Sequence, residues 1–348
     1  MLEFSRIATF FHIGSVQKYF RQPKLSVIIN CYNMSRELPR TLKSLSPPIQ
    51  KDVDPEDYEI IVVDNGSTEP FDKDYCKSIA DNIYFLDVQK PLASPCSALN
   101  AGMTVARGRL WLVMIDGARM ASPRLLRKSI DAAKLGKRSV IGTIAFHLGS
   151  EIQMQAVNNG YNQTAEDALL SSVAWEKDGY RLFDISVLAG SSLKGWFELP
   201  SETNAICMHK DTWRELDGYD VAFQAPGGGL ANLDMWKRAC NLPGSQVILL
   251  LGEATFHQFH GGIATNSTSI KSTLEEFNAE YKTVRGKNFS RPRVQFVTYG
   301  NLRQDMLNIG ISNHTKTNSN NSVSEQRENG RPRNSLEPER DNLQVIGT

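Results

Sequence analysis

The stretch Arg109-Leu-Trp-Leu-Val-Met-Ile-Asp-Gly-Ala-Arg119 decides how this chain is organised. Its apolar run, Leu110 to Ile115, is unbroken and stops at a carboxylate, Asp116. A short continuous apolar run that ends in this way favours a strand buried on both faces, as in a parallel sheet. Ligand sites of open α/β sheets lie just beyond the carboxyl ends of such strands, so Asp116 either meets a ligand there or only caps a loop.

Strand and helix signals alternate along the first half of the chain. Helices are expected to start near residues 35, 72, 97 and 122, where capping residues precede apolar positions at helical spacing. Strands are expected at residues 25–29, 58–63, 84–88, 110–115 and 140–146. This alternation is typical of an α/β fold in which a Rossmann-like, mostly parallel sheet is covered by helices.

The second half is less regular, and both ends of the chain differ from the middle. Strands are expected at 203–209 and 246–251, and helices near Asn232 and from Ser272 to Gly286. We expect an N-terminal arm at 1–22 and one domain at 23–300, with a first half at about 24–120 and a second at about 121–300. Residues 301–348 are expected to be a disordered polar tail, because large apolar residues are few there.

Composition excludes several classes of protein. The net charge of +1 gives no electrostatic footprint for nucleic acid. The longest apolar runs fall far short of the roughly 20 residues that a membrane helix needs. The five cysteines are scattered without CxxC spacing, which indicates neither a zinc site nor a disulfide framework. We therefore expect a cytoplasmic protein, with peripheral contact at the inner face of a membrane as an alternative.

Polar residues at three strand ends form the main candidate site. The chain lacks both GxGxxG after its first strand and a GxxxxGK[ST] loop, so the usual dinucleotide and P-loop interpretations lose their support. The three strand ends instead carry Asn30 with Tyr32, then Asp64, then Asp116. If these strands are neighbours in the sheet, their polar groups converge on one edge.

The same segments resemble family 2 glycosyltransferases, which have the GT-A fold. Leu25-Ser-Val-Ile-Ile-Asn-Cys-Tyr-Asn33 looks like the family's opening strand, and Tyr58-Glu-Ile-Ile-Val-Val-Asp-Asn-Gly-Ser-Thr68 like its second. Ala98 to Gly108 is similar to the helix before the central strand, and Ile115-Asp-Gly-Ala118 stands where a DxD motif is expected. Asn204 to Asp220 resembles the acceptor-side segment.

The resemblance, over roughly residues 24–262, implies a nucleotide-sugar donor and an inverting displacement at the anomeric carbon. It implies that Asn30, Tyr32 and Asp64 bind the nucleotide, that Asn100 shapes the donor site, and that Asp116 faces the ribose and diphosphate. It also places Asp234 near the acceptor hydroxyl as the catalytic base. The acceptor would be a glycan or a lipid-linked glycan.

The chain departs from the family's pattern in two places. Ala118 replaces the second acid of DxD, normally the metal ligand, which argues against a requirement for Mn²⁺ or Mg²⁺. A metal could still be held by Asp116 and His260 through waters, or Arg119 could supply the positive charge unless it faces solvent. The acidic pair that usually precedes Asp234 reads Ala231-Asn232. Asp234 could alternatively be only an acid favourable to a helix N-terminus.

Three further features allow a functional and a structural interpretation. His257 and His260 could ligate a metal, or one could pack inside while the other is exposed. Trp196 and Trp213 could stack on a sugar, although core packing is the commoner role of such residues. The loop Gly227 to Gly229 could be a lid or only a long turn.

The sequence predicts an inverting GT-A glycosyltransferase with a less regular acceptor-side half. The loss of two family acids leaves a second hypothesis, a catalytically silent module that binds nucleotide-sugars. A third, a nucleotidyltransferase on a similar sheet, is disfavoured because the chain has no Gly-rich basic loop after its first strand.

Overall fold

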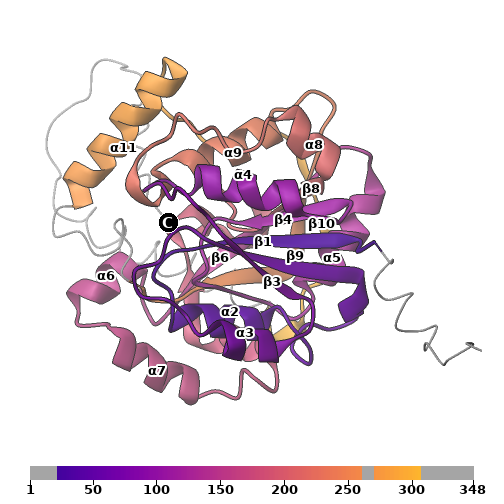
Figure 1. Ribbon diagram of the computed structural model, residues 1–348, viewed down its shortest axis with the longest axis vertical. Helices are drawn as coiled ribbons and strands as arrows, with labels where there is room; N and C mark the ends of the chain where they lie inside the picture. The colour runs from indigo at the N-terminus through magenta and orange to yellow at the C-terminus, as the bar shows by residue number, and fades with distance from the viewer. Residues whose placement is uncertain (1–21, 261–269, 307–348) are drawn as a thin grey trace, which may run out of the picture.

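The computed structural model describes residues 22–260 and 270–306 (Figure 1). The predicted N-terminal arm at 1–22 therefore lies outside the described residues, apart from Gln22. Residues 307–348 of the predicted tail also lie outside them. The first residues of that tail, 301–306, lead into the short 3-10 helix Gln304–Met306, where Met306 is buried.

One large mixed sheet forms the centre of the molecule. Its strand order is β10-β9-β6-β8-β4-β1-β2-β3. The pairs β1–β2, β1–β4, β2–β3, β6–β9 and β9–β10 are parallel, whereas β8 runs antiparallel to both of its neighbours, β4 and β6. Two short strands attach beside this path: β5 pairs with β9, and β7 pairs with β6. The strands are β1 Leu25–Cys31, β2 Tyr58–Asp64, β3 Ile83–Asp87, β4 Leu110–Met114, β5 Arg119–Ala121, β6 Ser139–Leu148, β7 Ser186–Leu188, β8 Ile206–His209, β9 Gln246–His257 and β10 Phe296–Gly300.

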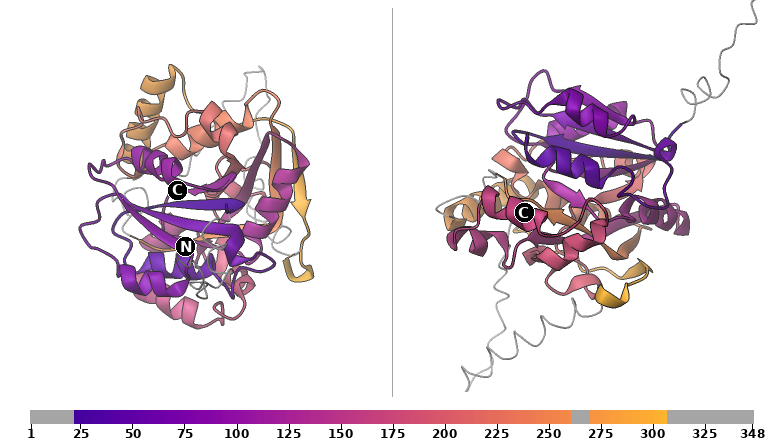
Figure 2. Two further views of the ribbon diagram at one scale, coloured as in Figure 1. Left: turned by 45° about the vertical axis from the view of Figure 1, so that its right-hand side comes forward. Right: turned by 90° about the horizontal axis from the view of Figure 1, so that it is seen from below.

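Helices cover both faces of the sheet, as expected for an α/β fold. In Figure 1, α4, α8 and α9 lie above the central strands, and α2 and α3 lie below them. The helices are α2 Glu37–Ser44, α3 Lys73–Ile79, α4 Cys96–Val105, α5 Leu125–Ala132, α6 Gln153–Asn158, α7 Gln163–Ser171, α8 Lys210–Glu215, α9 Ala231–Cys240 and α11 Ile270–Arg285. Figure 2 shows the late segments beside the early ones, in agreement with a strand order in which β8, β9 and β10 belong to the same sheet as β1 to β4.

Alternate residues of the central strands supply two separate layers of core. Ile28 of β1 packs in one cluster with Leu99 of α4, and its neighbours Val27 and Ile29 pack in another with Leu38 of α2. Because successive side chains of a strand point to opposite faces, an unbroken apolar run can bury both. This explains why the predicted all-apolar strands are central.

A third hydrophobic cluster is formed mainly by residues of the less regular second half, and it shows whether Trp196 is a core residue or could stack on a sugar. Trp196 packs there against Phe146 and Phe183, and its indole N–H donates to the Glu253 carbonyl at 2.9 Å. Trp213 is also fully buried, in the cluster beside α4. Neither indole can stack on a sugar in this arrangement, so both are core residues.

The sequence missed several elements. The helices α6 and α7 fall in the segment without a clear period, and β10 was not anticipated. The strand β10 lies at the end of the sheet, and most of its residues are half-buried or exposed, so its apolar pattern is weak. Among the residues that the structure describes, no helix combines the length and apolarity needed to cross a membrane.

Candidate active site

The three predicted strand ends lie side by side. Cys31 pairs with Asp64 across β1 and β2, and Ile29 pairs with Met114 across β1 and β4. The carboxyl ends of parallel neighbours meet at one edge of a sheet, so Asn30, Asp64 and Asp116 come within one region. The condition set from the sequence, that these strands are neighbours, is met.

The ends of β1 and β2 are tied together by their loops. The backbone N–H of Ser67 donates to Asp64 Oδ1 at 2.9 Å, and the Ser67 hydroxyl accepts from the backbone N–H of Asn33 at 2.9 Å. Asn30 is buried, whereas Tyr32, which directly follows β1, is 49% exposed. An exposed ring beside a fixed carboxylate is an arrangement that a nucleoside could occupy.

Asp116 is held in a tight turn with a buried arginine. Its Oδ1 accepts from the backbone N–H of Ala118, and its Oδ2 accepts from Arg119 Nε, both at 2.9 Å. The Arg119 side chain is only 1% exposed. The alternative that Arg119 faces solvent is therefore wrong. Arg119 lies on β5, which pairs with β9, and it stands opposite His257 in that pairing.

Two histidines join this turn from the end of β9. Asp116, His257 and His260 each offer a ligand atom, and these atoms all lie within 4.8 Å of one another. The two Nε2 atoms of the histidines are 3.0 Å apart. The chain turns directly after β9, which brings the two rings together, so the alternative of one packed and one exposed histidine is wrong.

Burial keeps both imidazoles neutral. It lowers the pKa of His257 well below its ordinary range, and the nearby Arg119 guanidinium and His260 lower it further. Burial also lowers the pKa of His260, against the opposing attraction of Asp116 and Glu37. A neutral imidazole is the form that ligates a metal.

Three buried polar atoms at this edge have no hydrogen-bond partner among the described residues. They are Asn30 Oδ1, Arg119 Nη2 and His257 Nδ1. Buried polar groups are nearly always paired, so unpaired ones call for an explanation. A polar ligand at this edge supplies one.

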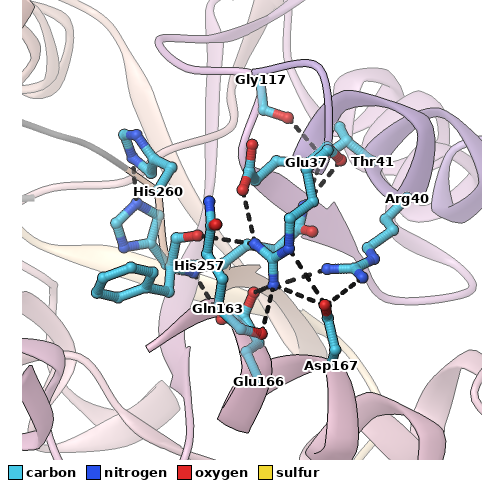
Figure 3. Close-up of polar contacts among 12 residues, drawn as sticks. Glu37, Arg40, Thr41, Gly117, Gln163, Glu166, Asp167, His257 and His260 are labelled. Atoms are coloured by element: carbon cyan, nitrogen blue, oxygen red, sulfur yellow. Dashed lines mark hydrogen bonds and ion pairs between the residues drawn. The ribbon is translucent and has the colours of Figure 1, made fainter. Parts of the chain in front are cut away.

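Helix α2 holds both parts of this cluster in place. Thr41 Oγ1 donates to the Gly117 carbonyl at 2.6 Å and accepts from Gln258 Nε2 at 3.1 Å. One hydroxyl therefore links the Asp116 turn to the segment between the two histidines. Figure 3 shows the hydrogen bond between Thr41 and Gly117 together with the histidine pair.

An ion-pair network fixes the residue before His260 (Figure 3). The backbone N–H of Phe259 donates to Glu166 Oε2 at 2.6 Å, and its carbonyl accepts from Arg36 Nη1 at 3.0 Å. Arg36 Nη2 also donates to Glu166 Oε1 at 3.0 Å. Burial raises the pKa of Glu166 to about 7 in spite of this pairing.

Asn100 contacts main chain at both ends of its amide. Its Nδ2 donates to the Tyr219 carbonyl at 2.7 Å, and its Oδ1 accepts from the Tyr219 N–H at 2.9 Å. Gly218 has a positive φ of 61°, and a Cβ there would lie 2.5 Å from Asn100 Oδ1. Asn100 therefore fastens the loop before Asp220 to α4.

Asp234 lies in a separate, fully paired cluster on α9. Its Oδ1 accepts from Arg285 Nε at 2.7 Å, and its Oδ2 accepts from Arg285 Nη2 at 2.6 Å and from Arg238 Nε at 2.8 Å. Guanidinium donors therefore occupy both oxygens of this carboxylate. The role of Asp234 as base stays a prediction, and this geometry favours an ion-pair role instead.

Sequence reasoning missed several residues of this region, above all Arg36, Glu166 and Glu202. Glu166 lies in the segment without a clear period, and Glu202 lies just before the strand expected at 203–209. The contacts that bring them into the site, to Arg36 and to Asn232, are long-range. Polar residues that flank unassigned loops were the only signal that could have pointed to them.

Comparison with known proteins gives a match to a family model over part of the chain. Residues 26–189 match the model of Glycosyl transferase family 2. This match confirms the resemblance drawn from the sequence over these residues, and the observed α/β architecture agrees with it.

A curated relative is validoxylamine A glucosyltransferase of Streptomyces hygroscopicus subsp. limoneus, 35% identical over 116 residues. The match covers 33% of this chain and 24% of that protein, so the chain spans about a quarter of the length of this relative.

Solved structures give a general likeness. The crystal structure of S. aureus TarS 1–349 covers 88% of this chain and 75% of that chain, with 14% identity and a TM-score of 0.46. The same protein in complex with UDP-GlcNAc gives 12% identity and a TM-score of 0.45, over 88% of this chain and 76% of that one.

Proposed function

We propose that this protein is an inverting glycosyltransferase that moves a sugar from a nucleoside diphosphate donor to a glycan or lipid-linked glycan acceptor. The observation that carries the proposal is the convergence of Asn30, Asp64 and Asp116 at one sheet edge, inside the segment that matches the family. The unpaired atoms beside them support a polar ligand there.

The proposed donor roles follow from position. Tyr32 and Asp64 would line the base and ribose pocket, with Asn30 at its floor, and Asp116 would face the ribose and diphosphate. Asn100 would act indirectly, by holding the Tyr219 loop. The leaving diphosphate concentrates negative charge as the sugar bond breaks, and a fixed cation such as Arg119 would stabilise it in a water-poor site.

We also propose a divalent metal site at Asp116, His257 and His260. One carboxylate oxygen and two neutral imidazoles whose ligand atoms lie within 4.8 Å of one another fit a single ion. Because His257 Nδ1 has no hydrogen-bond partner among the described residues, no contact fixes which nitrogen of that ring carries the proton. Mixed nitrogen and oxygen donors suit Mn²⁺ better than Mg²⁺, which prefers oxygen ligands. When bound, such an ion would neutralise charge developing on the diphosphate.

A catalytically silent nucleotide-sugar binding module is the second candidate. It is favoured by the pairing of both Asp234 oxygens with arginines and by the absence of an acid at Ala118. Such a module would bind the donor at the same edge without turning it over.

The test is a thermal-shift panel of UDP-, GDP- and dTDP-glucose and their diphosphates, each with Mn²⁺, Mg²⁺ or a chelator, followed by an assay of nucleoside diphosphate release. A ligand at 100 times its Kd adds about 2.7 kcal/mol. A shift with turnover supports the transferase, and a shift without turnover supports the silent module. Absence of any shift would contradict the donor site.

A further inference from the structure

A buried glutamate that belongs to no recognised motif, Glu202, lies next to the sheet edge that carries Asn30, Asp64 and Asp116. Glu202 precedes β8, which runs antiparallel to β4 with Ile206 opposite Val113. The chain ahead of Ile206 therefore runs past the carboxyl end of β4, toward Asp116. Glu202 is only 1% exposed, and the charges of Asp116 and Arg119 both act on it.

Asn232 fixes the position of this carboxyl group. Its Nδ2 donates to Glu202 Oε1 at 2.6 Å and to the Thr203 carbonyl at 3.0 Å. The Tyr219 hydroxyl donates to Asn232 Oδ1 at 2.9 Å, which sets the orientation of the amide. Asn232 is one of the two positions at which the family pattern led us to expect an acid. The structure brings a different carboxyl group to that place.

The surroundings of Glu202 differ from those of Asp234. No arginine hydrogen bond to Glu202 is present among the described residues, and the neutral amide of Asn232 is its partner. Burial raises the pKa of Glu202 to about 7; Asp116 adds to this, whereas Asn232 and the Arg119 guanidinium oppose it. A carboxyl group that exchanges its proton near neutral pH suits general base catalysis.

We propose that Glu202 is the catalytic base, in place of the acid missing at Asn232, and this rests on the proposed transferase function. Glu202 takes the proton of the acceptor hydroxyl as that oxygen bonds to the anomeric carbon. The bond from that carbon to the diphosphate breaks, its electron pair leaves with the nucleoside diphosphate, and Glu202 later releases the proton to water. Asn232 and Tyr219 position the base.

The test compares Glu202→Gln with the wild-type full chain, using whichever nucleoside diphosphate glucose gives turnover, with water or a glycan as acceptor. Glutamine keeps the shape and the Asn232 contact but cannot take a proton. We expect nucleoside diphosphate release to fall by about 10²-fold or more, with the donor Kd, measured by calorimetry, within about threefold of wild type. The thermal midpoint checks that the variant is folded.

Two further variants sharpen the result. Glu198 lies in the same segment, but it is half-exposed and ion-paired with Lys194 and Arg291. The turnover of Glu198→Gln is therefore expected to match that of the wild type. The double variant Glu202→Gln with Asn232→Asp moves the carboxylate across the 2.6 Å hydrogen bond, and we expect it to recover at least about tenfold of the lost turnover. Such recovery would not follow if Glu202 were only structural.

The outcomes separate this proposal from the function on which it rests. A wild type that neither binds nor turns over any member of the panel overturns the transferase and the base together. An active wild type beside a Glu202→Gln variant that keeps turnover within about threefold overturns the base alone. Equal losses of donor affinity and turnover also overturn it, because they would make Glu202 a binding residue.

Discussion

Two acidic clusters in this molecule each pair an aspartate with a buried or half-buried arginine, and they differ in how completely their polar atoms are used. Around Asp234, the guanidinium of Arg285 reaches Asp234 and Asp220, and Arg238 also donates to the Leu216 and Gly218 carbonyls. Around Asp116, Arg119 Nη2 and His257 Nδ1 have no partner among the described residues.

This difference indicates different roles. A network whose donors and acceptors are all matched joins elements, here α9, α11 and the loop before Asp220. A network with unpaired buried polar atoms destabilises the folded state, since each such group costs about 1–3 kcal/mol. We infer that the Asp116 cluster is built to receive a ligand and the Asp234 cluster to hold the fold.

The largest expected effect is on stability, at Asp234. Asp234→Asn removes the charge that two arginines share, and breaking a buried ion pair from one side costs about 3–5 kcal/mol of unfolding free energy. Urea unfolding measures it. Asp220→Asn, which removes a more exposed partner of Arg285, should cost less than about 1 kcal/mol. A stable Asp234→Asn variant without turnover would instead make Asp234 the base.

The next effect is on the pH dependence of stability, at Glu202. Its pKa rises from 4.5 to about 7 on folding, so the folded state binds more protons between these values. The unfolding free energy should therefore fall as pH rises from about 4.5 to about 7, by roughly 3 kcal/mol. Glu202→Gln should flatten this part of the profile. Identical profiles for the variant and wild type would contradict the raised pKa.

At Asp116 the effect should appear in ligand-dependent stability. Asp116→Asn should remove most of the roughly 2.7 kcal/mol that a nucleoside diphosphate with Mn²⁺ adds at 100 times its Kd. Thermal shifts with and without a chelator measure this. Asp87→Asn, an exposed acid on β3 paired with Lys73, is the matched control and should keep the full shift. Full retention by Asp116→Asn would remove it from the site.

Asp64 tests the nucleotide side of the same edge. Asp64→Ala should weaken nucleoside diphosphate binding by about 1–3 kcal/mol, the cost of a lost hydrogen bond to a buried polar partner. Calorimetric titration measures the affinity. Asp81→Ala, in the exposed turn before β3, should leave it unchanged. An unaltered affinity in Asp64→Ala would place the nucleotide elsewhere.

The smallest effect is expected at Thr41, which links the two halves of the Asp116 cluster. Thr41→Val keeps the shape but loses the bonds to Gly117 and Gln258, at a cost of about 1–2 kcal/mol. It should also reduce the Mn²⁺-dependent thermal shift. Thr104→Val removes only a bond within α4 and should change neither quantity. Loss of stability without any change in the metal-dependent shift would limit Thr41 to a structural role.

Local pattern was sufficient for the central part of the fold. The unbroken apolar runs before Asp64 and Asp116 predicted strands buried on both faces, and their polar ends predicted a shared edge. These features are local, because the two-residue period of a strand and the turn residues that end it are both written in a few neighbouring positions. The same pattern failed for β10 and α7, whose surfaces are only partly covered.

Only the tertiary structure decided which polar residues share a site. In sequence, Asp116 and Asp234 each looked like a lone acid, and His257 and His260 like a spacing that fits no strand face. The fold gave Asp234 two arginines, brought both histidines to Asp116, and placed Glu202 against Asn232. The physical reason is that a charge is defined by its partners and its burial, and both come from segments far apart in the chain.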